Sequence, residues 1–296
     1  MLQDDRAPFD RALRRARLSA YAPGEFVGQE SFMTAGEIRA LAAQAGVGPG
    51  VTVLDLCCGI AGPGRFLAGE LGCAYVGVDA SASAVAIARE RAAGLPCRFG
   101  IARIPPLPAG SFDVVFLLEA MLAFRDKDAL LREIAATLPP GGRFAFTLEE
   151  GRPLTSAERA AMPDADTVWL VPLDEMTMSL ERAGLAVTWQ EDHTRTHHAM
   201  AQALAGAFDA HAADIAAQIG RRAFDELLAA HRLWVEWLAQ GRVRKLALVA
   251  ERNGTAGLNA QSNVGPASRS GARAFADKAL ERLVAATRRA AEGQQL

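Results

Sequence analysis

A regular alternation of two kinds of segment between residues 51 and 150 constrains the fold of this chain most. Short apolar runs rich in β-branched residues recur here, and most are followed by a segment with the spacing of an amphipathic helix. This alternation is typical of right-handed βαβ crossovers, which build a parallel sheet covered by helices. The sequence therefore predicts an α/β fold with a doubly wound, mostly parallel sheet.

Seven strands are expected in all, and helices occupy most of the remaining chain. The strands are predicted at residues 51–57, 74–80, 97–103, 112–120, 143–150, 185–191 and 242–251. The helices are predicted at residues 5–19, 34–46, 65–71, 81–93, 126–138, 172–183 and 272–291, with a nearly continuous helical stretch at 194–240. Thr34 with Glu37 has capping-box spacing. Ser81 or Ser83, Asp126 and Asp128, and Thr194 are expected as helix caps.

The chain divides into five parts on this interpretation. They are N-terminal helices with a covering loop at residues 1–50, an α/β core at 51–192, a helical insertion at 193–240, a last strand at 241–252, and a linker with a C-terminal helix at 253–296. The insertion between the sixth and seventh strands should lie near the strand ends, where ligands bind to such sheets. We therefore expect a lid, although extra packing mass is the alternative. The N- or C-terminal helices are candidates for a homodimer contact.

Composition excludes several classes of partner. The 32 basic and 34 acidic residues nearly cancel, and aromatic residues are few, so nucleic acid is not expected. The four cysteines form no CxxC pair and indicate reduced core thiols rather than a metal centre, so no metal is predicted. The chain has no apolar leader-like stretch and no run of membrane-spanning length, so we expect a cytoplasmic location without a membrane partner.

The stretch VLDLCCGIAGPG, residues 53–64, joins the first strand to the next helix. Its glycines, Gly59, Gly62 and Gly64, do not have the G-x-G-x-x-G spacing of a dinucleotide loop. Asp55, inside the preceding strand, would repel phosphates but would suit a ligand that carries an ammonium group. A nicotinamide oxidoreductase on the same sheet is therefore disfavoured.

The same stretch resembles motif I of the class I S-adenosylmethionine-dependent methyltransferases, roughly D-x-G-x-G-x-G. Asp55 takes the acid position and Gly59 the middle glycine, while Cys57 and Ala61 replace the first and third glycines. The resemblance implies S-adenosylmethionine as cofactor. We expect the loop to survive both replacements if these positions keep negative φ.

Three further segments carry the resemblance: GVDAS at residues 77–81, SFDVVFLLEAML at 111–122 and LPPGGRFAF at 138–146. Asp79 ends the second strand, where an acid accepts both ribose hydroxyls. The acid that usually follows strand three is absent, and backbone groups of Arg103 and Ile104 are the replacement. The resemblance implies a cofactor site of Gln29, Asp55, Cys57, Gly59, Ala61, Asp79, Ala80, Arg103, Ile104 and Leu118.

Candidate catalytic residues come from three places. Glu119 follows the fourth strand and is the predicted base, with a cofactor contact or a surface carboxylate as alternatives. Tyr21 lies in a loop resembling the N-terminal cover of small-molecule members, such as the sarcosine and phosphoethanolamine N-methyltransferases. Its ring would attract a sulfonium, unless it merely packs. His193, His197 and His198 could face the acceptor, although a solvated position is expected for each one singly.

These residues predict a methyltransferase for a small metabolite or natural product. The acceptor atom would be nitrogen or a nucleophilic carbon, such as that of an indole, with an oxygen acceptor as the alternative. Trp169, Trp189, Trp234 and Trp237 could line an apolar acceptor pocket or pack in the core. A non-catalytic subunit that still binds the cofactor is the remaining alternative from another class.

Overall fold

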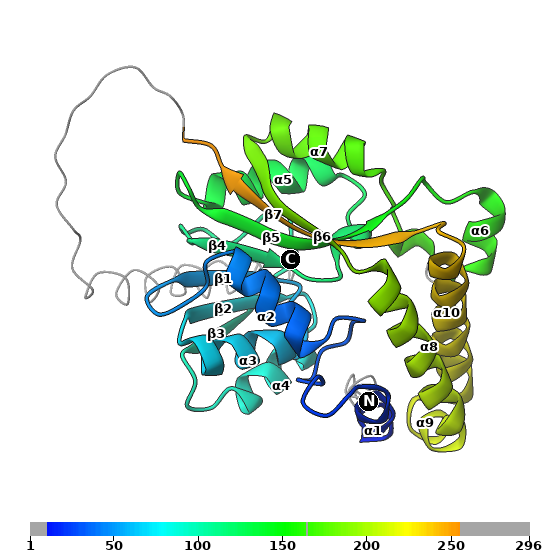
Figure 1. Ribbon diagram of the computed structural model, residues 1–296. Helices are drawn as coiled ribbons and strands as arrows, with labels where there is room; N and C mark the ends of the chain where they lie inside the picture. Colours follow the sequence, from blue (N-terminus) through cyan, green and yellow to red (C-terminus); the bar gives the residue numbers. More distant parts are fainter. Residues whose placement is uncertain (1–10, 164, 255–296) are drawn as a thin grey trace, which may run out of the picture.

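A single seven-stranded sheet organises the computed structural model, which describes residues 11–163 and 165–254 (Figure 1). The strand order is β3-β2-β1-β4-β5-β7-β6. β7 runs antiparallel to both of its neighbours, and the other pairings are parallel. The predicted doubly wound, mostly parallel sheet is confirmed. The strands are β1 Thr52–Leu56, β2 Ala74–Asp79, β3 Cys97–Ile101, β4 Val114–Leu117, β5 Arg143–Glu150, β6 Leu185–Asp192 and β7 Arg244–Arg252.

Helices cover both faces of the sheet. Apolar side chains that point alternately to the two faces along each strand form one core on each face. α2 Ala35–Gln44, α3 Gly62–Leu71 and α4 Ala82–Arg91 pack on one face, and α5 Lys127–Thr137 and α7 Leu173–Arg182 on the other (Figure 1). In β1, Val53 enters the first core, whereas Leu54 and Leu56 enter the second. This period-two division follows from side chains pointing alternately to opposite faces.

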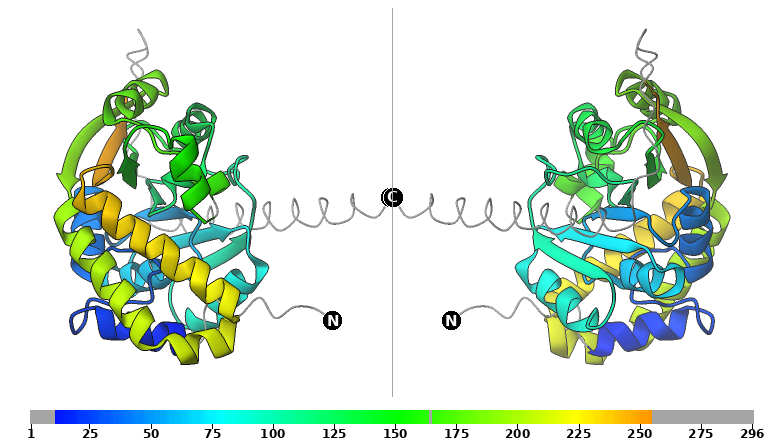
Figure 2. Two further views of the ribbon diagram at one scale, coloured as in Figure 1. Left: turned by 90° about the vertical axis from the view of Figure 1, so that its right-hand side faces the viewer. Right: turned by 90° about the vertical axis from the view of Figure 1, so that its left-hand side faces the viewer.

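A group of helices lies at the end of the sheet where β6 finishes and β7 begins (Figure 1). Three helices follow one another between β6 and β7: α8 Thr194–Ala210, α9 Ala212–Ile219 and α10 Arg221–Ala239. We call these three the helical block. The N-terminal helix α1, Arg11–Ala20, packs against it and shares its apolar core, which includes Leu13, Leu204 and Phe208 (Figure 2). The first helix of the chain is thus joined to a block that begins some 170 residues later.

The remaining short elements are η2 Met121–Ala123, α6 Ser156–Ala161 and η3 Ala165–Thr167. The expected caps at Thr34, Ser81 and Asp126 form as predicted. The cap at Thr194 was wrong, because α8 begins after His193 and the Thr194 hydroxyl instead accepts the Lys245 N–H. The linker and the C-terminal helix predicted within 253–296 lie outside the described residues beyond residue 254.

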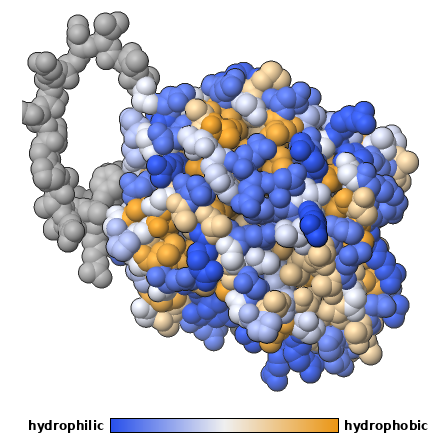
Figure 3. All heavy atoms as spheres, viewed as in Figure 1, coloured by the Kyte–Doolittle hydropathy of each residue, from blue (hydrophilic) through white to orange (hydrophobic). Residues whose placement is uncertain are grey.

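The outer surface mixes polar and apolar residues. In the face that Figure 3 shows, hydrophobic side chains lie in groups between more numerous hydrophilic ones, as is common for a folded protein surface. Within residues 11–163 and 165–254, every helix is too short or too polar to cross a membrane.

Two positions of α3 must be glycine, because the helix backbone there lies in close contact with neighbouring groups. A Cβ on Gly62 would lie 2.4 Å from the carbonyl group of Gly28, where the N-terminal loop crosses the helix. A Cβ on Gly64 would lie 2.0 Å from the ring of Tyr75 in β2. The helix can therefore sit against both partners only because these positions lack side chains.

We predict that Gly64→Ala lowers the free energy of unfolding by about 1–3 kcal/mol, because the added methyl group would overlap the buried Tyr75 ring. Gly69→Ala is the matched control in the same helix, since its Cβ would meet only Leu95 Cδ2 at 3.6 Å. That control should be neutral or stabilising by about 0.5–1 kcal/mol. Urea denaturation of both variants tests the prediction, and equal stabilities would contradict it.

Candidate cofactor and acceptor site

The loop between β1 and α3 adopts the left-handed backbone that its glycine-rich pattern would favour. The φ angles are 59° at Cys57, 52° at Gly59 and 56° at Ala61. The expectation of negative φ at Cys57 and Ala61 was therefore wrong. A non-glycine residue in this region costs about 1–2 kcal/mol. The surrounding bonds hold the conformation, since Ala61 N–H donates to the Cys58 carbonyl at 2.8 Å and Cys58 N–H to the Val78 carbonyl at 3.0 Å.

A cavity of about 240 Å³ opens at this loop, at the carboxyl ends of β1, β2 and β4. Ligands bind to open α/β sheets at this edge. The predicted residues that line it are Gln29, Asp55, Cys57, Gly59, Asp79, Leu118 and Glu119. Ala61, Ala80, Arg103 and Ile104 are not among the described residues that line the cavity, and their cofactor contacts stay predictions.

Two acids stand at the strand ends beside the loop. Asp55 is buried and accepts a hydrogen bond from the Tyr75 hydroxyl. Burial raises the pKa of Asp55 to about 7, against the lowering effect of that hydrogen bond. Asp79 accepts the N–H groups of Gly59 at 2.9 Å and Ser81 at 2.8 Å, which fixes its carboxylate at the end of β2.

The loop of residues 21–33 covers the cavity and is held by its own polar groups. Gln29 is buried and donates to the carbonyls of Glu25 and Met33, both at 2.8 Å, while its oxygen accepts the Val27 N–H. Tyr21 is buried too, and its hydroxyl donates to the Ser31 carbonyl. Gln29 thus shapes the loop as well as lining the cavity, and Tyr21 packs in the core of the helical block.

A buried lysine lies at the centre of the site, and sequence reasoning missed it. The Lys245 ammonium on β7 donates to Glu119 at 2.6 Å and to Glu149 at 2.7 Å. Glu149 lies directly opposite Lys245 in the β5–β7 ladder. The rings of Phe32 and Trp234 lie 5.1 and 5.4 Å from the ammonium, at cation–π distance. The signal in the sequence was a lysine directly before the apolar run LALVA of β7.

Glu119 lies between this lysine and the cavity at the glycine loop, which we call the cofactor cavity. It follows β4 with a φ of 53°, and its N–H donates to the Thr147 hydroxyl. Burial raises the pKa of Glu119, but the charges of Lys245 and His197 outweigh burial, so the pKa is lowered overall. Glu119 is therefore an ionised carboxylate whose Oε1 atom is buried without a hydrogen bond.

The histidines of the helical block are not solvated, contrary to expectation. His193 is 5% exposed and His197 is 1% exposed. His197 Nδ1 lies 3.9 Å from Glu119 Oε1, and its Nε2 lies 3.2 Å from Glu37 Oε2. Glu37 was predicted only as a capping-box residue, a role that it also fills. His198 is half-buried.

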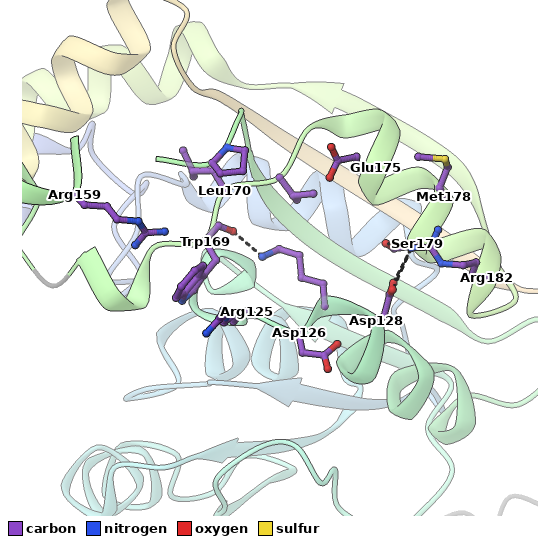
Figure 4. Close-up of a pocket in the computed structure, with 13 residues that line it drawn as sticks. Arg125, Asp126, Asp128, Arg159, Trp169, Leu170, Glu175, Met178, Ser179 and Arg182 are labelled. Atoms are coloured by element: carbon purple, nitrogen blue, oxygen red, sulfur yellow. Dashed lines mark hydrogen bonds and ion pairs between the residues drawn. The ribbon is translucent and has the colours of Figure 1, made fainter. Parts of the chain in front are cut away.

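The tryptophans divide between core and surface. Trp234 and Trp237 meet edge to face at 5.6 Å, and Trp237 is buried in an apolar cluster. Trp169 belongs to a separate hollow of about 790 Å³ that shares no lining residue with the glycine-loop cavity (Figure 4). There the guanidinium groups of Arg125 and Arg159 lie 4.9 and 4.5 Å from the Trp169 ring. This larger hollow lacks the strand-end acids and the glycine loop.

Comparison with known proteins agrees with the site at the glycine loop. Residues 53–142 match the family described as "Methyltransferase domain". The chain is 38% identical over 99 residues to phosphoethanolamine N-methyltransferase 1 of Arabidopsis thaliana, a match that covers 32% of this chain. The match spans only 20% of the plant protein's length. The family match therefore locates similarity to a methyltransferase domain in residues 53–142.

Solved structures share the fold. Phosphoethanolamine N-methyltransferase 2 of Haemonchus contortus, in complex with S-adenosyl-L-methionine, is similar over 84% of this chain and 59% of its own, at 19% identity and a TM-score of 0.69. The [4+2]-cyclase SpnF is similar over 84% of this chain and 94% of its own, at 21% identity and a TM-score of 0.67. These neighbours share the fold that the predicted class, an S-adenosylmethionine-dependent methyltransferase domain, implies.

We predict that Cys57→Gly retains the affinity for S-adenosylhomocysteine within about threefold, because glycine adopts the observed positive φ without strain. Cys57→Val should weaken binding at least tenfold, since a β-branched residue is strongly disfavoured in this region. Isothermal titration calorimetry measures both affinities. Equal affinities for the two variants would contradict this account of the loop.

The raised pKa of Asp55 predicts a pH-dependent stability. The protonated carboxyl group stabilises the fold fully below about pH 4, and this contribution is lost as the pH rises to about 7. The unfolding free energy of the wild type, relative to that of Asp55→Asn, should therefore fall by about 1.4 kcal/mol per pH unit in this window. Urea denaturation at several pH values tests it, and parallel pH profiles would refute it.

Proposed function

We propose that this protein is an S-adenosylmethionine-dependent methyltransferase whose acceptor is a nitrogen or a nucleophilic carbon of a small metabolite or natural product. The supporting observation is the position of Glu119. Its carboxylate lines the cofactor cavity and also contacts Lys245 and faces His197 beneath the helical block. A group at this junction can accept a proton from an acceptor that lies between cofactor and block.

Positioning does most of the work in methyl transfer, because the reaction is an in-line displacement at a sulfonium. The bound cofactor supplies an electrophilic methyl group. Asp79 is suited to receive the ribose hydroxyls, since its carboxylate is already oriented by the Gly59 and Ser81 amides. Asp55 and the loop around Gly59 form the neighbouring wall. Leu118 adds an apolar contact at the end of β4.

The lowered pKa of Glu119 favours particular acceptors. A weakly basic carboxylate is poor at removing a proton before methylation, but it suffices once methylation has made the proton acidic. A methylated amine becomes an ammonium that can leave still protonated, so it needs no base. A methylated indole carbon becomes an acidic cation, which loses its proton readily to a carboxylate. A phenol or alcohol would need a stronger base, and His193 or His197 would be the candidate for an oxygen acceptor.

The N-terminal segment and the helical block would enclose the acceptor. Tyr21 and His193 are buried on this side of the cavity and remain candidate catalytic groups. For Tyr21 the proposed contribution is its aromatic ring, since its hydroxyl already donates to Ser31. We also propose that two copies of the whole protein form a homodimer through their N- or C-terminal helices.

The fold alone does not fix the reaction, since one structural neighbour is named a cyclase. Release of S-adenosylhomocysteine separates the possibilities. The purified chain should release it when given S-adenosylmethionine and one class among small amines, indoles, phenols and carboxylic acids. Cofactor binding with no release on any class would favour a non-methylating role or a binding subunit.

We predict that Glu119→Gln lowers kcat by about 10²–10⁴-fold on a proton-bearing acceptor, because the amide cannot accept the proton. Glu149→Gln is the matched control, since it also removes a carboxylate from Lys245 but does not line the cavity. The control should lose less than tenfold. Affinity for S-adenosylhomocysteine, measured in parallel, reports whether either variant has lost its fold. Equal losses of kcat would assign Glu119 a purely structural role.

A further inference from the structure

A cluster of two histidines and a carboxylate stands beside the acceptor side of the site, and the proposed methyl transfer does not require it. We propose that Glu37, His193 and His197 form a binding site for a divalent transition-metal ion of the Zn²⁺ class. The site is defined by its ligand geometry, so it does not depend on the proposed function.

The three side chains converge from two elements. His193 and His197 are four residues apart at the start of α8, a spacing that brings side chains to one face of a helix. Glu37 reaches them from α2. Its Oε1 lies 3.7 Å from His193 Nδ1, and its Oε2 lies 3.2 Å from His197 Nε2. The ligand atoms lie within 4.8 Å of one another. Ligands bound at about 2.0–2.1 Å in a tetrahedral zinc site are about 3.3 Å apart, so only small movements are needed.

The second nitrogen of each histidine faces another carboxylate. His197 Nδ1 lies 3.9 Å from Glu119 Oε1, and His193 Nε2 lies 3.4 Å from Glu191 Oε2. Metal-bound histidines commonly donate their other N–H group to a carboxylate, which fixes the ring and its tautomer. This arrangement occurs here twice around one centre.

Buried side-chain atoms without a hydrogen-bond partner are an independent indication of a cation site. His193 Nδ1, His197 Nδ1 and Glu119 Oε1 are buried, and none has a hydrogen-bond partner. Buried polar atoms without partners are rare and costly. A cation at the centre would bind His193 Nδ1 directly. A slight rotation of His197 would then give its Nδ1–H group to Glu119 Oε1.

Charge balance favours a dication. The buried and half-buried groups that these contacts connect are three carboxylates and one ammonium: Glu37, Glu119 and Glu149, with Lys245. Three negative charges and one positive charge leave a net charge of −2 if the histidines are neutral. The Glu37 carboxylate is already oriented as a ligand, because it accepts the Thr34 N–H at 2.9 Å and the Thr196 hydroxyl at 2.7 Å.

The donor set identifies the class of ion. Two imidazoles and a carboxylate suit zinc, cobalt or iron better than magnesium or calcium, which prefer oxygen ligands. Three protein ligands leave a fourth position open, as in zinc sites that bind a substrate or water. Because Glu119 faces His197 on one side and lines the cofactor cavity, the ion would lie one side chain away from that cavity.

The first experiment uses the full chain, stripped with a chelator and titrated with Co²⁺ at pH 7.5 in the absence of cofactor and acceptor. We expect one equivalent to bind, with the visible absorption of a tetrahedral or five-coordinate N/O site. His193→Ala and His197→Ala should each lower the affinity at least 100-fold, because each removes one of three protein ligands. His211→Ala at the far end of α8 is the control and should leave the affinity unchanged.

The second experiment covers the case in which an alanine variant does not fold. X-ray absorption of the wild-type protein loaded with one equivalent of Zn²⁺ should show nitrogen and oxygen ligands at about 2.0–2.1 Å. Sulfur ligands at about 2.3 Å would instead locate the ion at the cysteines and overturn the proposal. Failure to bind Co²⁺ at pH 7.5 would also overturn it.

Discussion

The buried ion pairs of Lys245 hold the separate parts of this molecule in one arrangement. A buried ammonium must be paired with carboxylates, and here these come from β5 and from Glu119, two residues after the end of β4. Removing one partner of such a pair typically costs about 3–5 kcal/mol, because the other charge stays buried. β4, β5 and β7 are therefore joined by charge as well as by backbone hydrogen bonds.

The same lysine residue also sets the start of the helical block. Its carbonyl accepts the His193 N–H at 2.8 Å, and its N–H donates to the Thr194 hydroxyl at 2.9 Å. The backbone of residue 245 thus fixes where α8 begins, while the side chain fixes Glu119. One position in β7 consequently aligns the histidines with the carboxylate that lines the cofactor cavity.

The sheet and the glycine loop were predictable because their signals are local. Apolar runs of the right length identified the strands, and Asp55, Gly59 and Asp79 could be located by their spacing along the chain. The backbone angles of Cys57 and Ala61 were not predictable from composition, since small side chains were expected to avoid positive φ. Instead, the hydrogen bonds around the loop hold these two residues at positive φ.

The group of Glu37, Glu119, Glu149, His197 and Lys245 was harder to predict. These residues come from five places in the sequence, and they meet only because β7 inserts between β5 and β6 in the antiparallel direction. Glu37 satisfied a capping pattern, and Lys245 lies in a strand that was predicted from its apolar residues. Neither local pattern indicates a buried partner from a distant element.

The N-terminal segment has a mechanical consequence. Its helix α1 packs against the helical block, whereas eight residues later Gly28 rests on Gly62 of the core. The covering loop is therefore a strap anchored at both ends. A displacement of the block away from the sheet would pull on this strap and disturb the wall of the cofactor cavity. The position of the helical block and the shape of the cavity wall are therefore mechanically coupled.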